Sequence, residues 1–277
     1  MFENCEGGSV IRIESCSLAA ARRVAAMLDL DPARLVEGDP LPRGWQFILL
    51  GADTRRSDMR SDGFPGLGVP MPDLGLPRLL LGGRTVDYSH EIPIGSMVKR
   101  VSSIKSLTRK TATQGDMAVV TIAHELHVPT ASTAAIVETQ TYILLAGKNS
   151  AAAESTSVPQ AVSAETQKTV TPDETLLFQY SALGFNSHKI HIDKAYARDV
   201  EGFPGLVVNG GLVTLLLTEF LRTDLKLIPT SFRTKHLAPL FCGRPITLAA
   251  DRDGNIWRLR AYNDAGKIAA EMEVNTK

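Results

Sequence analysis

The sequence predicts a tandem α+β fold in which each half combines an antiparallel sheet with a helix. Two observations support this prediction: a polar segment over residues 149–171 divides the 277-residue chain, and the order helix, loop, strands occurs on both sides of it. The segment is rich in Ser, Thr, Ala and Gln and cannot bury enough apolar surface to offset its ordering entropy. We therefore expect an N-terminal domain over residues 1–148, a flexible linker over 149–171 and a C-terminal domain over 172–277.

The N-terminal half begins with a predicted helix, because apolar residues recur at helical spacing over Leu18–Leu30. Residues 51–78 are rich in Gly, Pro and Asp, which is typical of a long irregular loop. The strand pattern starts at residue 79. It is clearest in three segments that are enriched in β-branched residues and bounded by Gly, Pro or Asp: Met97–Leu107, Met117–Val128 and Ile136–Leu145.

The C-terminal half repeats this order of elements. A helix start is predicted at residues 171–174, where an N-cap candidate precedes Pro and two acids, and the helix continues through Phe178–Leu183. A loop follows, and an apolar helix is predicted over Gly211–Leu221. Four strands with tight-turn residues between some of them complete this half: Ser231–Leu237, Pro245–Ala250, Ile256–Tyr262 and Lys267–Val274.

Composition excludes several classes of function. Thirty basic and thirty acidic residues give no net charge, which argues against a nucleic-acid-binding protein. No apolar run approaches the roughly 18 residues of a membrane span, and the N-terminal residues resemble no signal peptide. The three cysteines are too far apart for a disulfide framework or a structural zinc site. We therefore expect a cytoplasmic protein without a metal, a membrane segment or a bound cofactor.

One stretch carries residues suited to chemistry. Asn186, His191 and Asp193 lie within eight residues of irregular chain, and the pair Gly210-Gly211 opens the apolar helix that follows. Unpaired N–H groups at a helix start can hold a developing oxyanion, and a histidine can move a proton near neutral pH. His188 and His191, together with Asp193, could instead bind a metal, although no further ligand stands at standard spacing.

Residues 178–193 (FQYSALGFNSHKIHID) and 201–212 (EGFPGLVVNGGL) resemble the MaoC-like double-hotdog hydratases and dehydratases. They are most similar to the branch of 3-methylfumaryl-CoA (mesaconyl-CoA) and itaconyl-CoA hydratases and mitochondrial 3-hydroxyacyl-thioester dehydratases. In the N-terminal half, residues 41–45, 76–84 and 138–140 resemble the same branch. The resemblance implies a tandem hotdog, an antiparallel sheet wrapped around a central helix in each half, whose N-terminal hotdog is non-catalytic and shapes the acyl pocket.

The resemblance also implies roles for the residues of the loop. His191 occupies the position of the catalytic acid/base. Asn186 stands where the wider family has an aspartate, and since an amide cannot take a proton from water it would position water or the substrate carbonyl. Asp193 would orient His191, with capping of a short helix over Lys194–Arg198 as an equal alternative.

Four residues match the oxyanion or substrate-binding part of the motif: Tyr180, Asn209, Gly210 and Gly211. Asn209 and Gly211 depart from the His and Pro that are usual there, and Asn209 could instead cap the helix. Arg84, Arg233 and Lys235 are candidates for the CoA phosphates. The segment His124–His127 is one residue too short for a zinc-binding H-E-x-x-H motif, and we interpret it as an exposed strand edge.

These expectations describe a hydro-lyase that adds or removes water across the double bond of an enoyl-CoA, with a short branched dicarboxylic substrate such as mesaconyl- or itaconyl-CoA. An acyl-carrier-protein thioester and a homodimer are further partner expectations. Three alternatives stay open: a hotdog thioesterase that uses Asp193 or Glu201, a dehydratase of fatty or polyketide 3-hydroxyacyl thioesters, and a non-catalytic acyl-thioester binder.

Overall fold

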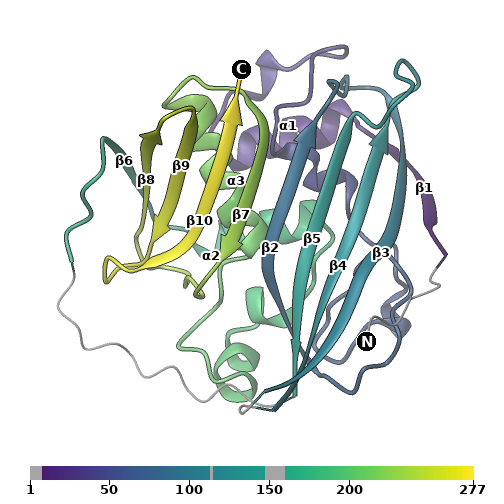
Figure 1. Ribbon diagram of the computed structural model, residues 1–277, viewed down its shortest axis with the longest axis vertical. Helices are drawn as coiled ribbons and strands as arrows, with labels where there is room; N and C mark the ends of the chain where they lie inside the picture. The colour runs from purple at the N-terminus through teal and green to yellow at the C-terminus, as the bar shows by residue number, and fades with distance from the viewer. Residues whose placement is uncertain (1–7, 113–114, 147–159) are drawn as a thin grey trace.

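The computed structural model describes residues 8–112, 115–146 and 160–277 and contains one antiparallel sheet of ten strands (Figure 1). The strand order across the sheet is β1-β3-β4-β5-β2-β7-β10-β9-β8-β6. The N-terminal half supplies β1 (Val10–Ser15), β2 (Arg78–Tyr88), β3 (Met97–Ala112), β4 (Gly115–His127) and β5 (Ile136–Leu145). The C-terminal half supplies β6 (Thr166–Val170), β7 (Pro229–His236), β8 (Ile246–Asp253), β9 (Ile256–Tyr262) and β10 (Ile268–Thr276).

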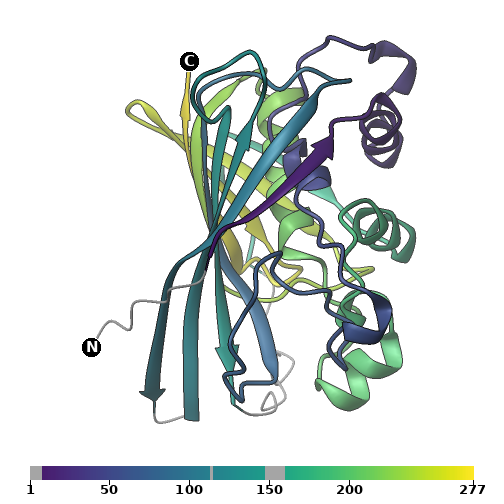
Figure 2. The ribbon, with the colours of Figure 1, turned by 90° about the vertical axis from the view of Figure 1, so that its right-hand side faces the viewer.

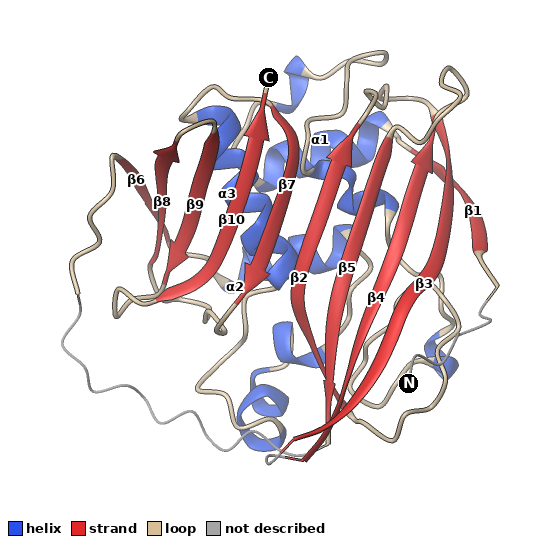
Figure 3. Cartoon of the chain, viewed as in Figure 1, coloured by secondary structure: helices blue, strands red, loops and turns tan. Residues whose placement is uncertain are grey.

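The helices lie on one face of this twisted sheet, as the side view in Figure 2 and the colouring by secondary structure in Figure 3 show. They are α1 (Leu18–Met27), α2 (Glu174–Leu183) and α3 (Gly210–Thr223). Side-chain caps start the first two, since Ser17 accepts from Ala20 N and Asp173 accepts from Leu176 N. No helix in the described ranges is both long and apolar enough to cross a membrane.

The two halves join where β2 pairs with β7, with Gly83 opposite Lys235 and Asp87 opposite Ser231. A Cβ on Gly83 would lie 2.7 Å from the Thr234 carbonyl oxygen, so the close approach of these strands requires glycine. Because the junction is a ladder of backbone hydrogen bonds, the halves form one continuous sheet. The predicted tandem α+β arrangement is confirmed. The central helix expected in each half is present only in the C-terminal half among the described residues, since the short 3₁₀ helix Trp45–Leu49 stands in its place in the N-terminal half.

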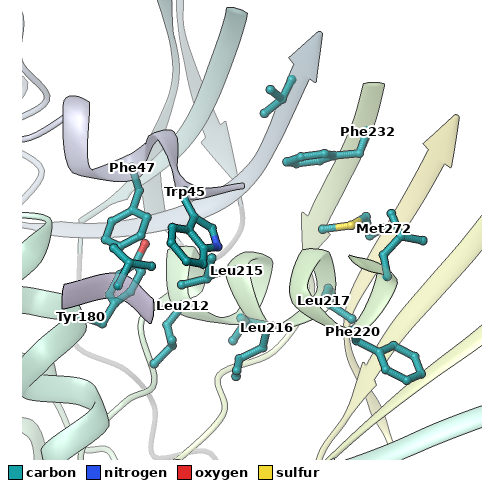
Figure 4. Close-up of a cluster of buried hydrophobic side chains, with 14 of the residues drawn as sticks. Trp45, Phe47, Tyr180, Leu212, Leu215, Leu216, Leu217, Phe220, Phe232 and Met272 are labelled. Carbon is teal, nitrogen blue, oxygen red and sulfur yellow. The ribbon is translucent and has the colours of Figure 1, made fainter. Parts of the chain in front are cut away.

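The main core surrounds α3, which is buried from Leu212 to Leu221. Figure 4 shows leucines of α3 beside Trp45 and Phe47, which come from the N-terminal half. The Trp45 indole N–H donates a hydrogen bond of 2.7 Å to Glu219 of α3. Neighbours from both halves cover α3, and this explains why its polar residues Thr214, Thr218 and Glu219 are buried together with its leucines.

Two predictions about the chain need correction. Residues 166–170 of the predicted linker form β6, an edge strand that pairs with β8. This pairing uses backbone hydrogen bonds, so the polar side chains of the segment did not indicate a strand. Residues 149–159 of the linker and the N-terminal residues 1–7 lie outside the described residues. The segment His124–His127 is not an exposed edge, because it lies in β4 between β3 and β5, and His124 is buried.

Candidate active site

A cavity of about 400 Å³ lies at the junction of β2 and β7, between the sheet and the start of α3. Apolar residues from both halves, among them Leu79, Leu81 and Val208, form much of its wall. Its polar lining residues are Arg84, Tyr142, Tyr180, Asn186, His188, His191, Asn209 and His236. No Asp or Glu side chain lines it in the described part of the chain.

His191 ends a short 3₁₀ turn, Lys189–His191, and is buried at the cavity wall. Its Nδ1 lies 2.7 Å from the carbonyl oxygen of Val207. A carbonyl only accepts, so Nδ1 carries the proton and Nε2 keeps a free lone pair. Burial lowers the pKa of His191 to about 3, with a further lowering by His188, and the ring is neutral at pH 7. A neutral imidazole in this tautomer is a proton acceptor.

Asn186 shapes the loop that carries His191. Its carboxamide oxygen accepts a hydrogen bond of 3.1 Å from the backbone N–H of His188, as in an Asx turn. The residue also lines the cavity, as the sequence predicted. Its role toward water or a substrate carbonyl stays a prediction.

Asp193 is exposed and is not among the residues that line the cavity. Its carboxylate accepts a hydrogen bond of 2.9 Å from Tyr196 N and caps the short helical segment that follows. The capping alternative is therefore confirmed. The group hydrogen-bonded to His191 Nδ1 is the Val207 carbonyl and not Asp193.

The N-terminus of α3 faces the cavity with Gly210 and Gly211. The first N–H groups of a helix have no intrahelical acceptor, and they carry the positive end of the helix dipole. Asn209 precedes the helix but makes no side-chain cap. Its Nδ2 donates to Ser181 Oγ at 3.2 Å, and its buried Oδ1 has no hydrogen-bond partner. The capping alternative for Asn209 is therefore wrong, and an acceptor is left free at the cavity.

Tyr180 brings its hydroxyl against the helix start. A Cβ at Gly211 would overlap this hydroxyl and lie 3.3 Å from the Arg84 guanidinium, which explains why glycine stands there. The Tyr180 ring stacks on Phe47 with ring centroids 4.7 Å apart. Burial raises the pKa of Tyr180 to about 12, so the hydroxyl stays protonated and can donate a hydrogen bond.

The three candidates for CoA phosphates do not form a common site. Arg84 is buried in the cavity wall and pairs with Glu138 at 3.1 Å, so its charge is not available to phosphates at the surface. Arg233 and Lys235 are exposed on β7, whereas Thr234 between them is buried. Because strand side chains alternate between faces, both basic residues lie on the sheet face opposite to Thr234. The assignment of Arg84 to phosphates is corrected on these grounds, and the roles of Arg233 and Lys235 toward phosphates stay predictions.

Two histidines of the cavity were missed as site residues. His236 ends β7, with its Nε2 lying 3.4 Å from Thr214 Oγ1, and burial lowers its pKa to about 3. His188 stands edge-on to His191, with ring centroids 5.6 Å apart. The sequence offered His188 only as a metal ligand, and the structure groups no three His, Cys, Asp or Glu side chains as a metal site among the residues it describes.

Residues 44–242 match the hydroxyacyl-thioester dehydratase type 2 family. The chain is 34% identical over 260 residues to the mesaconyl-C(4)-CoA hydratase of Chloroflexus aurantiacus, covering 93% of this chain and 91% of that protein. It is 33% identical over 97 residues to the mitochondrial hydroxyacyl-thioester dehydratase type 2 of Schizosaccharomyces pombe, covering 34% of this chain and 32% of the relative.

Solved structures show the same fold at low identity. The HtdX protein of Mycobacterium tuberculosis matches with a TM-score of 0.68 and 15% identity, covering 98% of this chain and all of that one. A MaoC-like dehydratase from Phytophthora capsici matches with a TM-score of 0.69 and 12% identity, covering 98% and 95%. A Mycobacterium tuberculosis protein described as a double hotdog matches with a TM-score of 0.60 and 12% identity, also covering 98% and 95%. These matches confirm the tandem hotdog fold.

Proposed function

The chain belongs to the hydroxyacyl-thioester dehydratase type 2 family, and we propose that this acyl-thioester hydratase/dehydratase carries out its reaction in the cavity between β2 and β7. The observation that carries the proposal is the environment of His191. The Val207 carbonyl fixes its tautomer, and the ring lines the same cavity as the N-terminus of α3. A proton acceptor and an oxyanion site therefore share one cavity.

In the proposed reaction, the thioester carbonyl accepts hydrogen bonds from the free N–H groups at Gly210 and Gly211. Nε2 of His191 takes one proton from water as the hydroxide oxygen bonds to the β-carbon. The π electrons of the C=C bond move toward the carbonyl and form an enolate, which the positive end of the helix dipole stabilises. Protonation of the α-carbon then gives the 3-hydroxyacyl thioester, and the reverse sequence is dehydration.

The proposed substrate is a short branched dicarboxylic acyl-CoA of the mesaconyl type. The name of the Chloroflexus relative supports this choice. The cavity volume of about 400 Å³ is also within the range of small-ligand pockets. Arg84 lines the cavity with a buried Nε that has no hydrogen-bond partner, and a guanidinium with a free donor suits a substrate carboxylate. A CoA carrier and a cytoplasmic location belong to the same proposal.

The thioesterase alternative requires a carboxylate near the thioester carbonyl. Asp193 caps a turn, and Glu201 pairs with Arg78 at 3.1 Å, so neither of these suspected carboxylates lines the cavity. No observation favours this alternative over hydration. A pure thioester binder would have no need of a histidine in a fixed tautomer.

The test is incubation of the purified protein with crotonyl-, mesaconyl- and itaconyl-CoA, with the products identified by mass spectrometry. We expect mesaconyl-CoA to gain one water and crotonyl-CoA to react more slowly. Release of the free CoA thiol would instead establish a thioesterase. Binding of all three thioesters without turnover would leave the chain as a non-catalytic binder.

A further inference from the structure

Residues 62 and 63 of the N-terminal half form hydrogen bonds with the loop that carries His191. The backbone N–H of Lys189 donates to Asp62 O at 2.8 Å, and Ser187 Oγ donates to Gly63 O at 2.7 Å. Gly63 has a φ of +78°, and a Cβ there would lie 2.6 Å from the Ser187 carbonyl oxygen. Only glycine fits so close an approach. Two hydrogen bonds and the glycine at position 63 therefore hold residues 62–63 close to residues 187–189.

This fastening brings the carboxylate of Asp62 to the rim of the site. Asp62 is buried, with a side-chain exposure of 7%. One carboxylate oxygen accepts from Phe64 N at 2.9 Å, and the other lies 3.0 Å from Arg60 and 3.7 Å from Nε2 of His188. The Asp62 carboxylate is therefore fixed on the side of His188 that carries Nε2.

His188 and His191 differ in what stands behind each ring. His191 has only a backbone carbonyl on its Nδ1, whereas His188 has the Asp62 carboxylate near its Nε2. A carboxylate stabilises an imidazolium far more than a neutral carbonyl does. Burial lowers the pKa of His188, but Asp62 and Glu201 oppose that effect, with Arg60 as the nearby cation. Of the two rings, His188 is the better place for a positive charge.

We propose that His188, backed by Asp62 from the N-terminal half, is a second acid–base group of the site and holds the proton taken from water until the α-carbon receives it. The inference rests on the proposed hydration, and it deepens that function by assigning residues that replace the carboxylate missing at Asn186. The side chain of His188 lines the cavity and stands edge-on to His191, so a proton has a short path between the rings.

The proton balance of the step is closed. Water gives one proton to Nε2 of His191 and its oxygen forms the bond to the β-carbon. The proton passes to His188, whose imidazolium the Asp62 carboxylate stabilises, and His191 returns to its neutral form. His188 then delivers this proton to the α-carbon of the enolate. The product contains both hydrogens and the oxygen of one water, and both rings end neutral.

The test compares Asp62→Asn and His188→Gln with Asp58→Asn as the matched control. Asp58 lies in the same loop and is half exposed, and within the described part of the chain its carboxylate pairs with its neighbours Arg55 and Ser57. Asparagine at position 62 keeps an acceptor for Phe64 N, and circular dichroism with thermal melting checks that each variant folds. We expect His188→Gln to lower kcat about 100-fold with little change in KM, and Asp62→Asn to lower it about 10-fold. Asp58→Asn should match the wild type.

Two further measurements distinguish a role of His188 in carrying a proton from a role of Asp62 in supporting the loop structure alone. In Asp62→Asn, the acid limb of the kcat–pH profile should move to lower pH, because His188 loses its anionic partner. The His188 resonance, identified by its absence in His188→Gln, should also titrate at lower pH in this variant by nuclear magnetic resonance.

Each negative result has a distinct meaning. A wild-type protein that hydrates no thioester overturns the proposed function and this inference with it. An active wild type whose variants keep the wild-type kcat, pH profile and histidine titration overturns this inference alone.

Discussion

The two halves of the molecule have matching strands but different connections. Counted from the β2–β7 junction outward, β2, β5, β4, β3 and β1 correspond in position to β7, β10, β9, β8 and β6. The difference lies between the first helix and the second strand of each half. The C-terminal half has the helix α3 (Gly210–Thr223) there, whereas the N-terminal half has the short 3₁₀ helix Trp45–Leu49 and a long loop.

Because of that difference, the two halves contribute different parts of the candidate site. The C-terminal half supplies the helix start and His191, and the N-terminal half supplies a wall with Arg84 and the loop that carries Asp62. Each half thus lacks what the other provides. The matching strands of the two halves join into one sheet. The connections that differ between the halves carry most of the residues proposed for the reaction.

The prediction with the largest expected effect compares one histidine substitution in each half of the molecule. His191→Gln should lower kcat by about 10²–10⁴-fold with a small change in stability, because it removes the proton acceptor. His124→Gln, in the N-terminal half, should leave kcat within about threefold but cost about 1–3 kcal/mol of stability, because it breaks the buried 2.8 Å bond to Ser102. Hydration assays and urea unfolding measure both. A loss of kcat in His124→Gln equal to that in His191→Gln would contradict the division.

A second prediction concerns the polar wall from the N-terminal half. Arg84→Met should cost about 3–5 kcal/mol of stability, because Glu138 would stay buried without its counter-charge. Gln46 and Gln140 still donate to the carboxylate at 2.9 and 2.7 Å, but neither neutralises it. The double variant Arg84→Met/Glu138→Gln should recover much of the loss in urea unfolding. Equal losses in the single and double variants would show that the pair is not coupled.

The smallest effect, per group and per pH unit, is the dependence of stability on pH. Burial lowers the pKa of His124 to about 4 and those of His191 and His236 to about 3, from 6.5. Above pH 6.5 these rings are neutral in both the folded and the unfolded state. Below it, only the unfolded chain binds protons, so stability falls by at most about 1.4 kcal/mol per pH unit for each histidine until the folded pKa is reached.

Urea unfolding between pH 7 and pH 4 measures this slope. His124→Gln should give a shallower slope than the wild type, since one of the buried histidines is removed. An unchanged slope would show that carboxylates alone set the acid sensitivity. His191→Gln sharpens the result, because it should reduce the slope by a similar amount while acting in the other half.

The parts of the fold that the sequence predicted are those with a local pattern. The helices α1 and α3 follow from apolar spacing, and α2 from the cap and proline at its start, because these patterns act within one or two turns. The edge strand β6 was assigned to a linker because Thr166–Val170 is polar and pairs through its backbone alone. Its partner β8 is distant in the chain, so no local pattern could reveal it.

The same distinction applies to the site. His191, Gly210 and Gly211 belong to one contiguous motif, and the structure brings them to one cavity. Asp62 lies in a Gly- and Pro-rich loop more than 100 residues before His188, and nothing in its surroundings in the sequence marks it. The pairing of Arg84 could not be predicted, because its partner Glu138 comes from another strand. Contacts between distant segments determine the surroundings of both residues, and no local sequence pattern reveals such contacts.

The union of β2 and β7 within a single polypeptide has a consequence for how such a protein can change over generations. In an assembly of two identical hotdogs, every mutation of the gene appears twice, once on each side of the junction. Here a mutation at Leu79 or Leu81 alters only one side of the cavity, and the motif around His191 is inherited unchanged. If the reaction runs in this cavity as proposed, selection can vary the wall from the N-terminal half while it preserves the motif around His191, and new substrate preferences can arise without a loss of catalysis.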